Sequence, residues 1–178
     1  MKKQLLLPFF SLLAVVLLLA GCDKSKSFTL ILECDNYVAR RELEVDIFAV
    51  NYSNKDRVLR VMVDDYWQAN GTKRTHAENR VTKKFSETQR QFEMSLKDPE
   101  VKAVWAKWEG QEATDLMVVA QLTAAKGSTL GDDDRCQIIP LKPKDLKLKY
   151  PNAKAFRIVV SEKGVELHPL KDIPKKAK

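Results

Sequence analysis

The sequence predicts a mainly β protein, an antiparallel β-sandwich with one or two helical insertions. Two observations support this expectation. Short segments rich in β-branched and aromatic residues recur along the chain between turn residues, and they give about eight strands. Most neighbouring strands are joined by short connections, which favours antiparallel pairing over long crossovers.

The first two strands are expected over residues 28–33 and 43–50, with a turn at Asp35 and Asn36 between them. The second strand alternates apolar and polar residues at first, but its polar face ends halfway, at Phe48 and Val50. We therefore expect the later half of this strand to be covered on both sides.

Residues 54–67 fit two kinds of structure. As a helix, the segment is capped by Asn54 and has an apolar face that ends at Tyr66. As a strand, it would align Leu59, Val61 and Val63 on one face. The helix is favoured because residues 64–67 do not alternate, and the strand remains the alternative.

The next three elements are a pair of strands and a helix. Residues 80–85 and 90–96 are expected to form a hairpin, and the alternation of the second strand predicts that it is half-buried. The clearest helix covers residues 98–110, with Asp98 as its N-cap and Gly110 at its end. Its apolar stripe at i, i+3, i+4 and i+7 consists of Val101, Val104, Trp105 and Trp108. Such a stripe is typical of a core-facing helix, and a tryptophan platform for a ligand is the alternative.

The last third of the domain reads as strands again. A nearly continuous apolar run over residues 115–122 indicates a central strand, and a long loop over residues 123–135 follows it. The next strand, residues 136–141, contains Pro140, which places its end at a sheet edge or where the chain leaves the sheet. Residues 155–160 and 164–168 predict a final hairpin.

The amino-terminal segment has the pattern of a secretion signal. Two lysines precede an apolar run of about sixteen residues, shorter than the roughly 20 that a membrane-spanning helix needs. The run ends in Leu19-Ala20-Gly21-Cys22, which resembles the lipobox of bacterial lipoproteins. The resemblance implies cleavage before Cys22, a diacylglycerol on its sulfur and acylation of the new amino terminus. An uncleaved membrane anchor is the alternative.

The lipobox resemblance also implies where the chain acts. The mature protein would be held in the lipid bilayer through acylated Cys22 and face the periplasm of the cell envelope, where nucleic acid is not an expected partner. In enterobacteria, an aspartate after the lipidated cysteine, here Asp23, is similar to an inner-membrane retention signal, so the inner membrane is favoured over the outer. Removing the two lysines of residues 1–21 lowers the formal net charge from +7 to +5.

Four parts of the chain follow from these observations. They are a signal peptide (residues 1–21), a short lipidated tether (22–27), one sandwich domain (28–170) and a basic tail (171–178). By coil statistics the tether reaches about 10–15 Å, so the domain should lie close to the membrane.

Two cysteines remain once Cys22 is lipidated. In an oxidising compartment, Cys34 and Cys136 are expected to form a disulfide, which would close a loop of about 100 residues. Two separate buried thiols are the alternative. A redox-active pair is not expected because the chain has no C-x-x-C spacing.

No catalytic or metal-binding pattern occurs in the sequence. The two histidines, His76 and His168, are isolated, and no hydrolase, nucleotide-binding or zinc motif is present. The aspartates of residues 132–134 lack the spacing of a calcium loop. We therefore expect a protein that is not an enzyme and that needs no metal or cofactor. Tyr66 and Trp67 are the candidate contacts for a ligand or partner, although a packed aromatic pair is the more ordinary interpretation.

The domain also resembles the lipoproteins of type VI secretion membrane complexes. The likeness rests on the lipobox, the short tether and residues 45–51, which match their first core strand. It implies a transthyretin- or immunoglobulin-like sandwich with a helical insertion and a structural or assembly role, exercised through a partner protein of the envelope. Segments such as residues 96–99 and 113–116 also look like an uncharacterised family of envelope lipoproteins, which implies no activity. A glycan- or small-ligand-binding lipoprotein that uses Tyr66 and Trp67, or the Trp105 and Trp108 helix, is the alternative.

Overall fold

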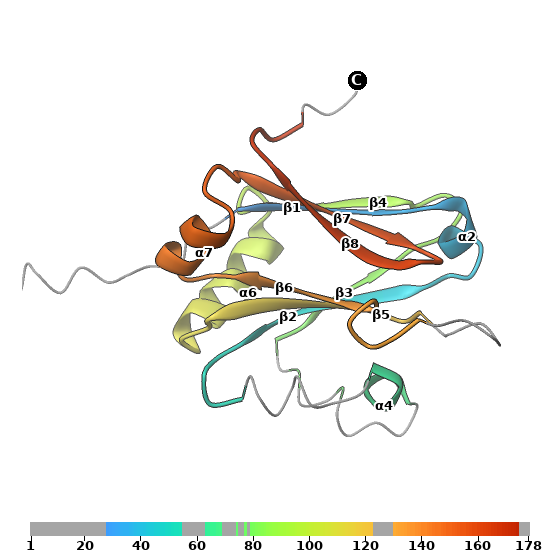
Figure 1. The fold of residues 1–178 in the computed structure, drawn as a ribbon, viewed down its shortest axis with the longest axis horizontal. Coiled ribbons are helices and arrows are strands. Elements are labelled where there is room, and N and C mark those ends of the chain that lie inside the picture. Colours follow the sequence, from blue (N-terminus) through green and yellow to red (C-terminus); the bar gives the residue numbers. More distant parts are fainter. Residues whose placement is uncertain are drawn as a thin grey trace, which may run out of the picture.

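Two four-stranded sheets pack face to face in the computed structural model, as the sequence predicts (Figure 1). The structure describes residues 28–54, 63–68, 74, 77, 79–122 and 130–174. One sheet has the strand order β4-β1-β7-β8 and is called sheet A; the other has the order β3-β2-β5-β6 and is called sheet B. The strands are β1 (Thr29–Cys34), β2 (Glu44–Val50), β3 (Val81–Lys84), β4 (Gln91–Met94), β5 (Asp115–Ala120), β6 (Cys136–Pro140), β7 (Ala155–Ser161) and β8 (Gly164–Leu170).

Pairing in sheet B is antiparallel throughout, whereas sheet A contains one parallel pair, β1 with β7. The prediction that the sheets are antiparallel is therefore wrong for this pair. The two strands are not joined by a turn, and a long intervening chain allows a parallel crossover. In this register Thr29 lies opposite Ala155, so β1 and β7 start at the same end of the sandwich.

The predicted hairpin of residues 80–85 and 90–96 does not form. β3 pairs with β2 in sheet B, and β4 pairs with β1 in sheet A. The chain does turn tightly between them, with reciprocal backbone hydrogen bonds between Ser86 and Gln89. The two phenylalanines that flank this turn, Phe85 and Phe92, contact each other edge to face at 5.3 Å. The strand pairings show that the segment crosses from sheet B to sheet A at this turn.

The main core lies between the sheets. Every residue of β5 is buried, and β5 lies between β2 and β6, which confirms the predicted central strand. Pro140 ends β6, an edge strand, as expected. The β7–β8 hairpin also forms as predicted, with Ser161 opposite Gly164.

Four helices complete the described chain: α2 (Asn36–Ala39), α4 (Val63–Trp67), α6 (Pro99–Gly110) and α7 (Pro143–Lys149). None of the described helices is long and apolar enough to cross a membrane. The Asp98 side chain caps α6, and Gly110 is the last residue of the helix, both as predicted. The residue with a left-handed backbone after the helix is Glu112. A short helix, α2, replaces the expected turn because the Asp35 carboxylate accepts from the backbone N–H of Val38.

Helices α4 and α7 differ in how well the sequence predicts them. Residues 63–67 are helical, in agreement with the favoured interpretation, and residues 55–62 lie outside the described part. Helix α7 was not predicted, because it has no apolar stripe: Leu146 is its one buried residue, and lysines occupy three of its other positions. The signal segment and tether, residues 1–27, also lie outside the described residues.

Candidate functional site

The outer face of sheet B carries the candidate site, because helix α4 covers part of it (Figure 1). Phe48 and Val50 of β2 point away from the sandwich core and form a second apolar cluster with Met117, Val119, Val63, Tyr66 and Ala77. This cluster confirms that the later half of β2 is covered on both sides. Tyr66 stacks on Phe48, with ring centroids 5.7 Å apart.

Asp46 lies beside this cluster and is fully buried. Its carboxylate accepts hydrogen bonds from Tyr66 Oη at 2.9 Å and from Thr82 Oγ1 at 2.6 Å. The Arg74 guanidinium contributes two more, at 2.8 and 3.1 Å, and Arg80 lies 3.7 Å away. A buried carboxylate is tolerated only when its oxygens are satisfied in this way.

Arg74 joins the polar and aromatic parts of the site. Its guanidinium also donates to Glu44 at 2.7 Å and lies over the Trp67 ring, 4.4 Å from the centroid. The hydrogen bonds to Asp46 and Glu44 raise the pKa of Arg74 above its ordinary value. Burial, reinforced by the Asp46 charge, raises the pKa of Tyr66, so its hydroxyl remains a donor. We call Glu44, Asp46, Tyr66, Trp67, Arg74 and Thr82 the Asp46 cluster.

A second ion-pair network fastens α4 to the loop before β6. The Arg135 side chain is 4% exposed and pairs with Asp64 at 2.5 Å and with Asp132 at 2.6 Å. Burial alone would lower the pKa of Arg135, but these two carboxylates outweigh it and raise the pKa. Asp132 also accepts from the backbone N–H of Val63, at the start of α4. The start of α4 is thus held by charged groups from a distant part of the chain.

The predicted contact residues have different positions. Tyr66 is 5% exposed and its hydroxyl is occupied by Asp46, so it supports the fold and does not face a ligand. Trp67 is half-buried and contacts Tyr66 edge to face, with ring centroids 5.1 Å apart. The two rings thus form the packed aromatic pair that was the more ordinary interpretation of the sequence. Its Nε1 is buried without a hydrogen-bond partner among the described residues. Trp105 and Trp108 are both buried in the main core, so the helix they occupy is not a ligand platform.

The predicted disulfide is absent, because Cys34 and Cys136 are both free thiols. Cys34 ends β1 in sheet A and packs against the core between the sheets. Cys136 begins β6 and packs against the outer cluster of sheet B. In this structure sheet B therefore lies between the two sulfurs. Burial raises the pKa of each thiol to about 11.

The remaining polar candidates have structural roles. Asp132 pairs with Arg135, and the Asp134 carboxylate accepts from the backbone N–H of Gly131 at 2.8 Å. His168 lies half-exposed on edge strand β8, 3.3 Å from Glu166. His76 lies outside the described residues. Within the described ranges, no group of His, Cys, Asp or Glu is arranged to hold a metal ion.

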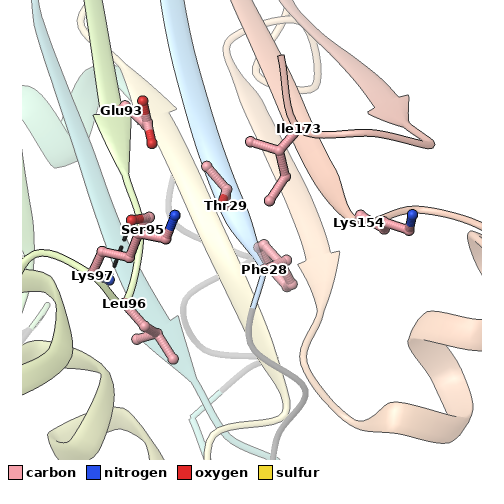
Figure 2. A pocket seen from close by; sticks show the side chains of 8 residues that line it. All are labelled: Phe28, Thr29, Glu93, Ser95, Leu96, Lys97, Lys154 and Ile173. Carbon is pink, nitrogen blue, oxygen red and sulfur yellow. Dashed lines mark hydrogen bonds between the residues drawn. The ribbon is translucent and has the colours of Figure 1, made fainter. Parts of the chain in front are cut away.

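A shallow pocket of about 340 Å³ lies at the end of sheet A where β1 begins. Figure 2 shows Phe28 and Thr29 in its middle, between the segment after β4 and the residues that flank β7 and β8. Its lining residues are Phe28, Thr29, Glu93, Ser95, Leu96, Lys97, Lys154 and Ile173. Leu96 and Ile173 are large apolar side chains left exposed there, at 37% and 49%.

The charged members of the Asp46 cluster were not predicted from the sequence. The alternation of residues 43–50 predicts Asp46 on the polar face of its strand, and Arg80 falls in the strand expected over residues 80–85, so no site is predicted from either residue. The signal present in the sequence was the loss of polarity after Asp46, which shows that something covers the strand. This signal does not show which arginine pairs with the carboxylate, because Arg74 lies 28 residues from Asp46 in the sequence and no local pattern connects them.

No family model matches the sequence, and the search of curated proteins finds no relative. Among solved structures, the chain is similar to Lip of Serratia marcescens, a membrane bound component of the type VI secretion system. The identity is 11%, the TM-score is 0.45, and the match covers 84% of this chain and 99% of that chain. A likeness at this level does not transfer a function.

Proposed function

We propose that the chain is a non-catalytic lipoprotein of the bacterial cell envelope, anchored through acyl chains on Cys22. The observation that carries the proposal is the spacing between the lipobox and the fold. Phe28, six residues after Cys22, is buried and packs against Trp105 and Phe156 at centroid distances of 5.4 and 4.9 Å. A lipid at Cys22 would therefore hold the folded body directly against the bilayer, since two or more acyl chains anchor stably.

Mass spectrometry of the mature protein tests the anchor. The expected product begins at Cys22 and carries a diacylglycerol and an amide-linked acyl chain. The matched control is Cys22→Ser, which we expect to stay unprocessed and without lipid. A mature protein with an unmodified Cys22 sulfur, or one that leaves membranes without detergent, contradicts the proposal.

We further propose that the domain acts by contact with an envelope protein, and that Trp67 belongs to the contact surface. Two observations support this part. The Trp67 ring is half-buried and held between Tyr66 and Arg74, so it is presented in one orientation. The Asp46 cluster fixes α4 on the outer face of sheet B with buried charge, which favours one arrangement of this segment over many.

A photo-crosslinking amino acid at position 67 tests the surface in intact cells. We expect a specific protein adduct from position 67 and none from Lys163, an exposed residue of the β7–β8 turn. Equal adducts from both positions, or none from position 67, would show that Trp67 is not a contact. Membrane retention by Asp23 stays a prediction, and fractionation of an Asp23→Ser variant measures it.

A further inference from the structure

We infer that helix α7 lies against the membrane surface, with Leu148 among the headgroups and its lysines on anionic lipid. The inference rests on the proposed anchor at Cys22. The surface concerned, called the α7 face, consists of Lys144, Lys147, Leu148 and Lys149.

The α7 face lies at the end of the sandwich where the chain enters. Tyr150, directly after α7, contacts Phe156 at 5.1 Å, and Phe156 contacts Phe28 at 4.9 Å. Two ring contacts therefore connect this helix to the first residue of the domain. Figure 1 shows α7 at the same end of the molecule as the starts of β1 and β7.

The distance to the lipid is limited by covalent geometry. Only five residues, 23–27, lie between Cys22 and Phe28, and the six residue steps that join these two span at most about 20 Å when fully extended. The opposite end of the sandwich, with α2 and the β7–β8 turn, is a strand length further away. The end that carries α7 is thus the end that a lipid at Cys22 holds near the bilayer.

The chemistry of the α7 face matches an anionic interface. Leu146 turns into the core, whereas Leu148 is 83% exposed with a lysine on either side. Residues 142–154 contain five lysines and a single acid, Asp145. An exposed leucine among lysines is the composition of segments that lie in the membrane interface.

The pocket beside Phe28 extends this surface. Leu96 and Ile173 are its exposed apolar residues, and Lys97 and Lys154 flank them (Figure 2). Its charge is more balanced, because Lys154 pairs with Asp172 at 3.1 Å and Glu93 lines the opposite side. We therefore place the strongest lipid contact at α7. Near an anionic membrane each lysine contributes about a fivefold gain in partitioning.

Lipid quenching of a fluorophore tests the inference on the full-length acylated protein. The starting protein carries Cys34→Ala and Cys136→Ala, and Leu148→Cys or Lys163→Cys supplies one thiol for an environment-sensitive label. Each protein is reconstituted into vesicles of phosphatidylcholine, with or without about one third phosphatidylglycerol. A spin label in the headgroup region of the lipid serves as the quencher.

We expect quenching at position 148 in anionic vesicles, its reduction at high salt, and no quenching at position 163. Salt acts because the Debye length falls from about 10 Å at 0.1 M to 3 Å at 1 M. Replacing Lys144, Lys147 and Lys149 by Gln should remove the quenching, with circular dichroism unchanged because these side chains are exposed. The matched control replaces Arg40, Lys84 and Lys163, at the far end, by Gln.

The possible failures give different signals. Equal quenching at positions 148 and 163 overturns the inference. Quenching at position 148 that is the same with and without phosphatidylglycerol in the vesicles also overturns it. A crosslink from position 148 to a protein, without lipid quenching, assigns the α7 face to a protein partner and also overturns it. Labelling of the starting protein, whose sole remaining cysteine is Cys22, shows a free sulfur there. That result overturns the proposed anchor, and the inference with it.

Discussion

Arg74 and Asp46 form a two-point ion pair on the outer face of sheet B. Arg74 Nε lies 2.8 Å from Asp46 Oδ2, and Nη2 lies 3.1 Å from Oδ1. Asp46 has no exposed side-chain surface, whereas Arg74 retains 27%. The carboxylate is therefore the member that depends on the pair, since the arginine keeps part of its hydration.

Asp46→Ala should destabilise the domain by about 2–3 kcal/mol. The substitution removes the carboxylate that accepts hydrogen bonds from the Tyr66 hydroxyl and from Arg74 Nε. Urea unfolding measures the change in free energy. The control is Glu162→Ala, in the exposed β7–β8 turn, which should stay within about 0.5 kcal/mol of the unmodified protein. Equal effects from the two variants would show that the buried network does not hold the fold.

Tyr66 should make the domain lose stability at alkaline pH. Its pKa is raised in the folded state by burial and by Asp46, so the folded protein keeps this proton at a pH where the unfolded chain releases it. The stabilisation is complete below about pH 10 and is lost as the pH rises further, by up to about 1.4 kcal/mol per pH unit. Urea unfolding between pH 8 and 11 should show a shallower decline for Tyr66→Phe.

Tyr52 provides the control for this pH profile. It is 78% exposed, so Tyr52→Phe should leave the alkaline decline unchanged. Cys34 and Cys136, whose pKa values are raised to about 11, add a decline of the same sign in every variant. A Tyr66→Phe profile parallel to that of Tyr52→Phe would contradict the role assigned to the hydroxyl.

Gly164→Ala should destabilise the β7–β8 hairpin by more than about 1 kcal/mol. Gly164 has a φ of +128°, and an added Cβ would lie 2.5 Å from the Asp134 carbonyl oxygen. Gly110→Ala is the opposite case, because this helical glycine has nothing within 4 Å of an added Cβ. It should stabilise the domain by about 0.5–1 kcal/mol. Thermal unfolding of both variants measures these shifts, and a shift of the same sign in both would refute the argument.

The two half-buried cysteines should be found as thiols in the purified protein. Alkylation in denaturant without a reductant should add two groups, one each at Cys34 and Cys136, as read by mass spectrometry of peptides. In the folded protein at pH 8 both should react slowly, since a pKa of about 11 leaves roughly a hundredfold less thiolate than a pKa of 9. If neither cysteine is alkylated and a peptide crosslinked through Cys34 and Cys136 is found, the predicted disulfide exists. The arrangement of the sheets described above would then be wrong.

Local patterns gave most of the strands and the main helix correctly. The alternation in residues 43–50, the continuous run of β5 and the stripe of α6 each depend on the period of one element, which the sequence displays directly. Pairing was harder to predict. β3 and β4 were expected to pair because they are neighbours in the chain, and instead each pairs with a different sheet.

The sequence by itself determined the class of fold and the order of its strands along the chain, and it predicts a lipobox at Cys22, because these features depend on residues close together in the chain. The tertiary structure decided that Cys34 and Cys136 lie on different sides of sheet B, and that Asp46 receives Arg74 and Tyr66. It also decided that Leu148 shares an end of the sandwich with Phe28. The physical reason is that side-chain partners across a sandwich are set by strand register and sheet order, which no local period encodes.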